Sequence, residues 1–128
     1  MSSPVSSVWQ LDEALLEKPS KWSLVVVLSL RQDTLRFNEL RRAIGGISQK
    51  ILTTTLRELE RDGYVSRTHF ATIPPRVEYE LTDLGHELLV LARAWEQFTI
   101  DHRQEIAQAR KRFDIAAQSA PIRLVSRG

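Results

Sequence analysis

Residues 48–61 carry side chains that could hydrogen-bond to the edges of nucleic-acid bases and pair with phosphate groups. At 100° per residue, one side of a helix over this segment collects apolar residues, namely Ile51, Leu52, Leu56 and Leu59. The opposite side collects Lys50, Thr53, Thr54, Arg57 and Arg61, with Gln49 at its flank. Hydroxyl, amide and lysine groups suit base edges, whereas arginine suits guanine or phosphate. This side therefore has the composition of a helix that enters the major groove of DNA.

A solvated helix face is the simpler interpretation of such a pattern. Three consecutive threonines at 53–55 argue against it, because threonine is a mediocre helix former with little reason to crowd a solvent face. We expect residues from Ser48 to Thr54 to reach deepest into the groove, and Arg57 and Arg61 to contact backbone phosphates.

The elements before this segment form the first part of a helix-turn-helix unit, in which two helices are joined by a short glycine-containing turn. In chain order we expect an amphipathic helix over 8–17, a central apolar helix over 21–31 capped by Ser20, an extended link over 33–37, a helix over 37–44 that ends at Gly45-Gly46, and the helix after Ser48, which ends near Asp62 before Gly63.

Two strand-like segments follow, over 64–71 and 76–81, with Ile73-Pro74-Pro75 between them. A hairpin directly after a helix-turn-helix unit is a wing. Arg76 follows two prolines, so we expect it on a stiffened tip, where it could enter a minor groove, grip a phosphate or simply be solvated.

A long helix over 83–113 is predicted next, with Thr82 as its cap. Its apolar residues recur at three- or four-residue steps, and its length of roughly 45 Å exceeds what so small a domain can cover. A second copy of the chain is the simplest partner for the remaining apolar stripe, so we expect a homodimer.

The expected fold class is mainly α with a small β-hairpin (α+β), a winged helix-turn-helix with flanking dimerisation helices. The expected organisation is a flexible N-terminal arm over 1–7, a domain over 8–113 whose dimerisation helix is 82–113, and a disordered tail over 114–128. The 128 residues fit one domain of this kind. The formal net charge is only +2, but residues 36–76 hold eight basic against four acidic side chains.

Several function classes find no support. The chain contains no cysteine, which excludes disulfides, thiolate metal sites and thiol redox chemistry. The three histidines lack metal spacing, and no phosphate loop or nucleophile motif is present, so we expect no enzyme activity, metal or cofactor. No apolar run is long enough for a membrane span, and no leader pattern is visible, so we expect a cytoplasmic protein with no membrane partner.

The sequence resembles the HxlR-type winged-helix regulators, relatives of the MarR group, over about residues 8–100. The segments that carry the resemblance are 21–24 (KWSL), 36–42 (RFNELRR), 46–52 (GISQKIL), 56–65 (LRELERDGYV), 74–79 (PPRVEY) and 81–85 (LTDLG). The resemblance implies a dimeric bacterial transcription factor that responds to a small molecule or an oxidant. It also implies that the DNA contacts come from Asn38, Ser48, Gln49, Lys50, Thr53, Thr54, Arg57 and Arg76. We add Arg36 to these expected DNA contacts.

The sequence departs from this family at two places. Members often carry a sensor cysteine near the position of Trp9, and their usual glycine pair is replaced by Pro19-Ser20. A signal would then have to be a ligand or a partner protein. An apolar ligand pocket or the dimer core could be formed by Trp9, Trp22, Trp95 and Phe98, although aromatic residues more commonly just fill a core.

The sequence therefore predicts a sequence-specific regulator of transcription that binds double-stranded DNA as a homodimer on an inverted repeat. Family analogy favours a repressor, with a small-molecule effector as a further partner. The alternative is a winged-helix module that binds protein, which would favour an apolar or acidic outer face on the helix over 48–62.

Overall fold

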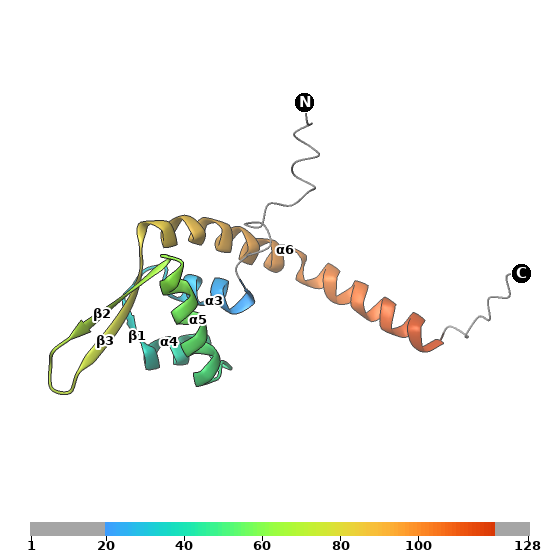
Figure 1. Ribbon diagram of the computed structural model, residues 1–128. Helices are drawn as coiled ribbons and strands as arrows, with labels where there is room; N and C mark the ends of the chain where they lie inside the picture. The colour runs from blue at the N-terminus through green and yellow to red at the C-terminus, as the bar shows by residue number, and fades with distance from the viewer. Residues whose placement is uncertain (1–19, 120–128) are drawn as a thin grey trace, which may run out of the picture. The chain divides into compact units, whose positions relative to one another are not determined.

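A computed structural model describes residues 20–119, which form seven helices and strands. In chain order these are α3 (Lys21–Ser29), β1 (Leu35–Arg36), α4 (Phe37–Ile44), α5 (Gln49–Arg61), β2 (Val65–Phe70), β3 (Arg76–Leu81) and α6 (Asp83–Ser119) (Figure 1). The described chain is mainly helical with one small antiparallel sheet, which confirms the predicted fold class. The expected arm over 1–7, the expected helix over 8–17 and residues 120–128 lie outside the described residues.

Side-chain caps and a glycine mark three helix ends that the sequence predicted, namely the starts of α3 and α5 and the end of α5. Ser20 Oγ accepts a hydrogen bond from Ser23 N (3.1 Å), and Ser48 Oγ accepts one from Ile51 N (3.1 Å). Gly63 follows α5 with a φ of 84°, a left-handed conformation that most other residues adopt at a cost.

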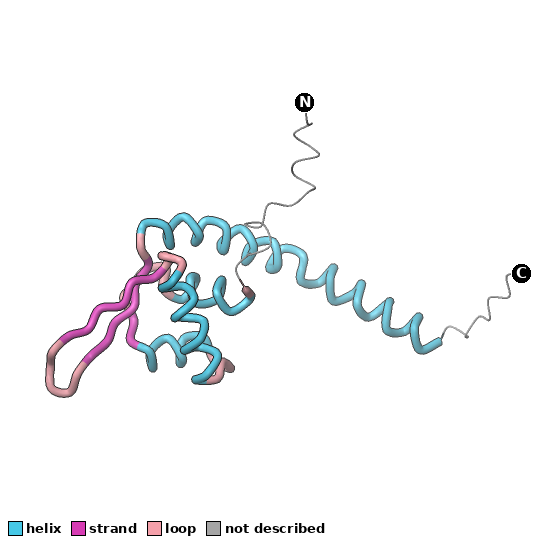
Figure 2. The backbone as a smooth tube through the Cα atoms, viewed as in Figure 1, coloured by secondary structure: helices cyan, strands magenta, loops and turns pink. Residues whose placement is uncertain are grey.

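The sheet has three strands in the order β1-β3-β2, one more than the predicted hairpin (Figure 2). Leu35 of β1 pairs with Tyr79 of β3, and the Thr34 hydroxyl donates to Glu80 Oε2 (3.2 Å). The sequence predicted only an extended link here, because two residues are too few for strand alternation to be visible.

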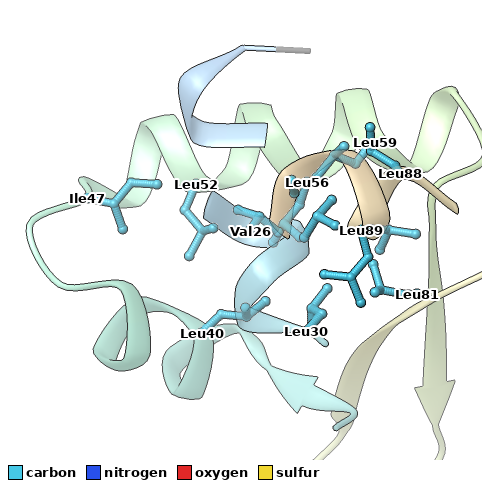
Figure 3. Close-up of a cluster of buried hydrophobic side chains, with 13 residues drawn as sticks. Val26, Leu30, Leu40, Ile47, Leu52, Leu56, Leu59, Leu81, Leu88 and Leu89 are labelled. Atoms are coloured by element: carbon cyan, nitrogen blue, oxygen red, sulfur yellow. The ribbon is translucent and has the colours of Figure 1, made fainter. Parts of the chain in front are cut away.

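The core lies where α3, α4, α5, the sheet and the start of α6 meet. Its fully buried side chains come from all three helices of the first part of the domain, and include Val26, Leu30, Leu40, Leu52 and Leu56 (Figure 3). Burying apolar side chains of this size from water stabilises the fold by about 1.5–3 kcal/mol each. This core fixes the two helices of the helix-turn-helix unit relative to the wing.

The described residues divide into two units, 20–93 and 94–119, and α6 contributes to both. In the first unit, α6 buries Gly85, Leu88, Leu89 and Ala92. The helix continues to Ser119, whereas the sequence predicted that it ends at 113 and gives way to a disordered tail. Alanine and glutamine at 116–118 favour helix without adding to an apolar stripe, so a stripe-based prediction stopped too early.

Candidate nucleic-acid interface

Helix α5 presents a polar and basic outer face on top of a buried inner face. Leu52, Leu56 and Leu59 are buried in the core. The residues predicted to contact DNA from this helix are all exposed, namely Gln49, Lys50, Thr53, Thr54 and Arg57, and Arg61 is exposed with them. The structure thus places these side chains on the side of α5 that faces away from the core.

Two residues of α5 lie on faces that the sequence analysis did not assign to them. Ile51 was predicted to pack into the domain, but it is 41% exposed. Thr55 was counted among three threonines on a solvent face, but it is buried. The buried face is centred between Leu52, Thr55 and Leu59, so it is rotated from the one expected from the apolar residues alone. Only two of the three threonines are therefore available to a partner.

Ser48 is exposed and serves as the N-cap of α5. Its hydroxyl oxygen already accepts a hydrogen bond from Ile51 N, while its hydroxyl hydrogen can still donate to an acceptor such as a phosphate oxygen. The N-terminus of α5 also carries the partial positive charge of the helix dipole, which favours an anion at this end.

Polar and basic residues at the end of β1 and in α4 border a hollow beside the sheet. Arg36, Asn38 and Arg42 line this hollow, which has a volume of about 360 Å³, together with Phe37, Glu39 and Val77. Arg36 N donates to Glu39 Oε1 (2.8 Å) and so helps to fix the start of α4. The structure thus brings the predicted residues Arg36 and Asn38 together and adds Arg42. The sequence offered a signal for Arg42, because it stands four residues after Asn38 on the same helix face.

A second hollow of about 370 Å³ lies between α5 and the sheet. It is lined by Phe37, Thr53, Leu56, Arg57, Glu60, Arg67 and Tyr79. Arg67 of β2 pairs with Glu60 of α5 through an Nε–Oε2 distance of 3.4 Å. Arg67 is a cation beside Arg57 that the sequence analysis did not select, because its place depends on how β2 lies against α5.

The phenol of Tyr79 lies in this second hollow. Burial is the main cause that raises its pKa above the ordinary value of 10.0, and the charge of Glu60 adds to the rise while Arg67 opposes it. Tyr79 is therefore neutral at physiological pH and can act as a hydrogen-bond donor.

Arg76 is not at the tip of the wing, in contrast to the sequence prediction. It is the first residue of β3 and pairs across the hairpin with Phe70, with its guanidinium carbon 4.3 Å from the centre of the Phe70 ring. Its buried Nε lies 3.1 Å from Glu78 Oε2, in an ion pair without the geometry of an aligned hydrogen bond. Side-chain packing on the aromatic ring outweighs extension into solvent at this position.

The second unit carries a row of aromatic side chains along α6. Trp95 and Phe98 are stacked with their ring centres 5.9 Å apart, and the ring of His102 lies 4.6 Å from that of Phe98. Trp95 and Phe98 are 56% and 50% exposed. Trp22, in the first unit, packs against the core, and Trp9 lies outside the described residues, so the grouping of all four aromatics stays a prediction.

The part of the chain over residues 20–119 holds no cluster of three or more potential metal ligands among histidine and acidic side chains. None of its helices is both long and apolar enough to cross a membrane.

Comparisons with known proteins match the chain to a family model and to several relatives. A family model described as HxlR-like helix-turn-helix matches residues 19–107. An HTH-type transcriptional regulator of Escherichia coli, YtfH, is 43% identical over 76 residues, which are 59% of this chain and 60% of YtfH. The chain thus matches less than two thirds of that relative's length.

Solved structures resemble the chain over more of its length. The ytfH protein of Salmonella typhimurium is 34% identical with a TM-score of 0.70, over 77% of this chain and 88% of that one. The redox regulator HypR in its reduced form is 33% identical with a TM-score of 0.68, over 83% of this chain and 99% of that one.

Proposed function

The chain belongs to the HxlR-like helix-turn-helix family, and on this premise we propose that it acts as a homodimeric repressor that binds an inverted-repeat operator in double-stranded DNA. Its role as a transcriptional regulator of the helix-turn-helix type follows from the family and its named relatives. The relatives and the fold are those of regulators rather than of enzymes.

The outer face of α5 is the observation that carries DNA binding. Its exposed hydroxyl, amide and cationic groups are those that bond base edges in the major groove, and its inner face is anchored by buried leucines. Arg57 and Arg67 beside the hollow between α5 and the sheet, and Arg36 and Arg42 beside the hollow at α4, supply cations for phosphates near the outer face of α5. A rigidly held helix flanked by cations supports sequence-specific rather than purely electrostatic binding.

Dimerisation is proposed on the apolar stripe of α6. Leu91, Trp95, Phe98 and Phe113 recur at helical spacing and are each at least half exposed in the single chain. Exposed apolar groups gathered on one stripe mark an interaction surface, and a second copy is the partner that also gives two recognition helices. Two-fold symmetry then predicts half-sites about 10 bp apart.

Repression and a ligand complete the proposal. A small dimer that covers an operator can block transcription without a further domain. One solved relative is named a redox regulator, but this chain contains no cysteine, so we propose a ligand rather than a thiol reaction as its signal. The proposed ligand pocket or dimer core comprises Trp9, Trp22, Trp95 and Phe98.

A winged-helix module that binds protein is the second candidate. It would favour an apolar or acidic outer face on α5, whereas this face carries Lys50, Arg57 and Arg61. The exposed Ile51 on this face favours the second candidate.

In vitro selection from random duplex DNA at about 150 mM salt tests the proposal, because non-specific binding is weak at physiological salt. The purified protein is incubated with the library, and bound molecules are amplified and sequenced over several rounds. We expect an enriched inverted repeat with half-sites about one helical turn apart. Salt-sensitive binding without enrichment would contradict specific DNA recognition and favour the protein-binding candidate.

A further inference from the structure

The second hollow, between α5 and the sheet, has an apolar wall as well as charged groups. Its volume of about 370 Å³ falls within the range of about 300–1,000 Å³ that small-molecule pockets occupy. Phe37 is half-buried and Leu56 is buried, and both line the hollow. A DNA phosphate is hydrophilic and gains nothing from such a wall. The lining therefore fits a ligand that has an apolar part.

The polar lining of the second hollow carries a net positive charge. It includes two guanidinium groups, of Arg57 and Arg67, and the carboxylate of Glu60. Arg67 Nε lies 3.4 Å from Glu60 Oε2, so these two charges largely offset each other. Arg57 forms no ion pair with any other residue of the described range 20–119. One positive charge therefore remains for a ligand that carries a single negative charge.

Hydroxyl groups stand beside these cations. Tyr79 pairs directly with Arg67 across the β2–β3 ladder, so the sheet holds the phenol next to the guanidinium group. The Tyr79 hydroxyl makes no hydrogen bond to the other described residues and is therefore available as a donor. Thr53 lies four residues before Arg57 on the same side of α5. A carboxylate only accepts hydrogen bonds, and donors of these kinds suit it.

We propose that the second hollow binds a small monocarboxylic acid with an apolar body. The carboxylate accepts hydrogen bonds from Arg57, Arg67 and the Tyr79 hydroxyl. The apolar body contacts Phe37 and Leu56. This site lies entirely within the first unit and shares no residue with the aromatic pocket proposed above, so it is a separate ligand site.

Binding of the acid weakens operator binding, and this part of the inference rests on the proposed function. Thr53 and Arg57 line the second hollow and are also expected DNA contacts. An acid bound to Arg57 withdraws that cation from the phosphates, and its own negative charge repels them. Acid and operator therefore compete for the same chain, and each lowers the affinity for the other by the same factor.

Isothermal titration calorimetry of the intact protein without DNA tests the site. The probe is cyclohexanecarboxylate; cyclohexanecarboxamide has the same body without the charge, and acetate has the charge without the body. We expect one cyclohexanecarboxylate per chain, with a Kd at least about tenfold below those of the other two compounds. Tyr79→Phe should raise this Kd about tenfold, because it removes one donor to the carboxylate. The control Tyr64→Phe, outside the hollow, should leave the Kd unchanged.

Fluorescence anisotropy with the selected operator tests the competition. Cyclohexanecarboxylate at about ten times its Kd should raise the operator Kd at least about tenfold. Acetate at the same concentration keeps the ionic strength equal, and it should raise the operator Kd less than about twofold. In Tyr79→Phe, the effect of the acid on that variant's own operator Kd should fall to about twofold per chain, because the acid then stands near its Kd.

Four outcomes would overturn the inference in whole or in part. Equal affinities for the acid and its amide, or an unchanged Kd in Tyr79→Phe, would refute the site. Binding of the acid without any change in the operator Kd would refute the competition. Selection of an operator by a protein that shows no saturable binding of the acid would refute the inference and leave the proposed function intact. Failure to select an operator would refute the proposed function and the competition, whereas calorimetry would still decide the site.

Discussion

The substitution Gly85→Ala tests whether the start of α6 is packed as tightly against the end of α5 as the structure indicates. Gly85 is buried, and Gly85 N donates to Thr82 Oγ1 (3.0 Å). The Thr82 hydroxyl in turn donates to the carbonyl of Gly63, directly after α5. A Cβ added at Gly85 would overlap the Tyr64 carbonyl oxygen, far inside their van der Waals contact distance, and would lie 3.2 Å from Leu81 Cβ.

The expected magnitude follows from two opposing effects. Overpacking of a rigid interior costs about 1–3 kcal/mol, and the upper end applies because the obstructing atom belongs to the backbone and cannot rotate away. Alanine gains about 1 kcal/mol over glycine inside a helix. The net expectation is a loss of about 2 kcal/mol in the free energy of unfolding, or roughly 6–8 °C in melting temperature for a chain of this length.

Thermal unfolding followed by circular dichroism at 222 nm measures this loss at a fixed protein concentration, since the proposed dimerisation would couple stability to concentration. The control Glu87→Ala changes an exposed residue of the same helix, and its melting temperature should stay close to that of the wild type. A Gly85→Ala variant as stable as the wild type, or more stable, would refute the close approach of α6 to the turn after α5.

Three further predictions concern binding, assembly and pH. Arg57→Ala should weaken operator binding and reduce the slope of log K against log salt by about 0.9 per lost phosphate contact, with two such contacts in a dimer. The control Arg103→Ala, in the second unit, should leave the slope unchanged. Equal slopes for the wild type and both variants would contradict the assignment of Arg57 to a phosphate contact. Trp95→Ala should raise the dimer Kd measured by sedimentation at least tenfold, because it removes an exposed aromatic side chain from the apolar stripe of α6. The control Val90→Ala, away from the stripe, should leave the dimer Kd unchanged. A wild-type protein that sediments as a monomer would refute the dimer. Because the pKa of Tyr79 is raised in the folded protein, its phenol ionises first in the unfolded chain as pH rises through 10. The free energy of unfolding of the wild type should therefore fall more between pH 9 and 11 than that of Tyr79→Phe. Parallel curves of stability against pH for the two proteins would contradict the burial of the phenol.

Much of the fold could be predicted because local signals and long-range packing agree. Ser20 and Ser48 cap helices as their position before an apolar run predicts, and Gly63 ends α5 in the left-handed conformation. The strand over 76–81 has the bounds that its alternation predicted. Each of these elements is specified by residues within a few positions of it.

The parts that the sequence did not predict depend on contacts between distant segments. Leu35 and Arg36 form a strand only because β3 lies beside them. Arg67 lines the second hollow, between α5 and the sheet, where it pairs with Glu60 of α5. Arg76 was expected at the tip of the wing, but Phe70 and Glu78, both fixed by the hairpin register, hold it against the sheet. A single sequence shows the residue types at these places but not which partner each will meet.

The most direct test of the central claim, that the exposed face of α5 reads base sequence in duplex DNA, is the ratio of affinities for the selected operator and for a scrambled duplex of equal composition. Both are titrated with the intact protein at about 150 mM salt by fluorescence anisotropy, with the stoichiometry of the operator complex measured alongside. We expect a preference of at least about 10³-fold for the operator, with two chains bound to each inverted repeat. Equal affinities for the two duplexes would contradict it.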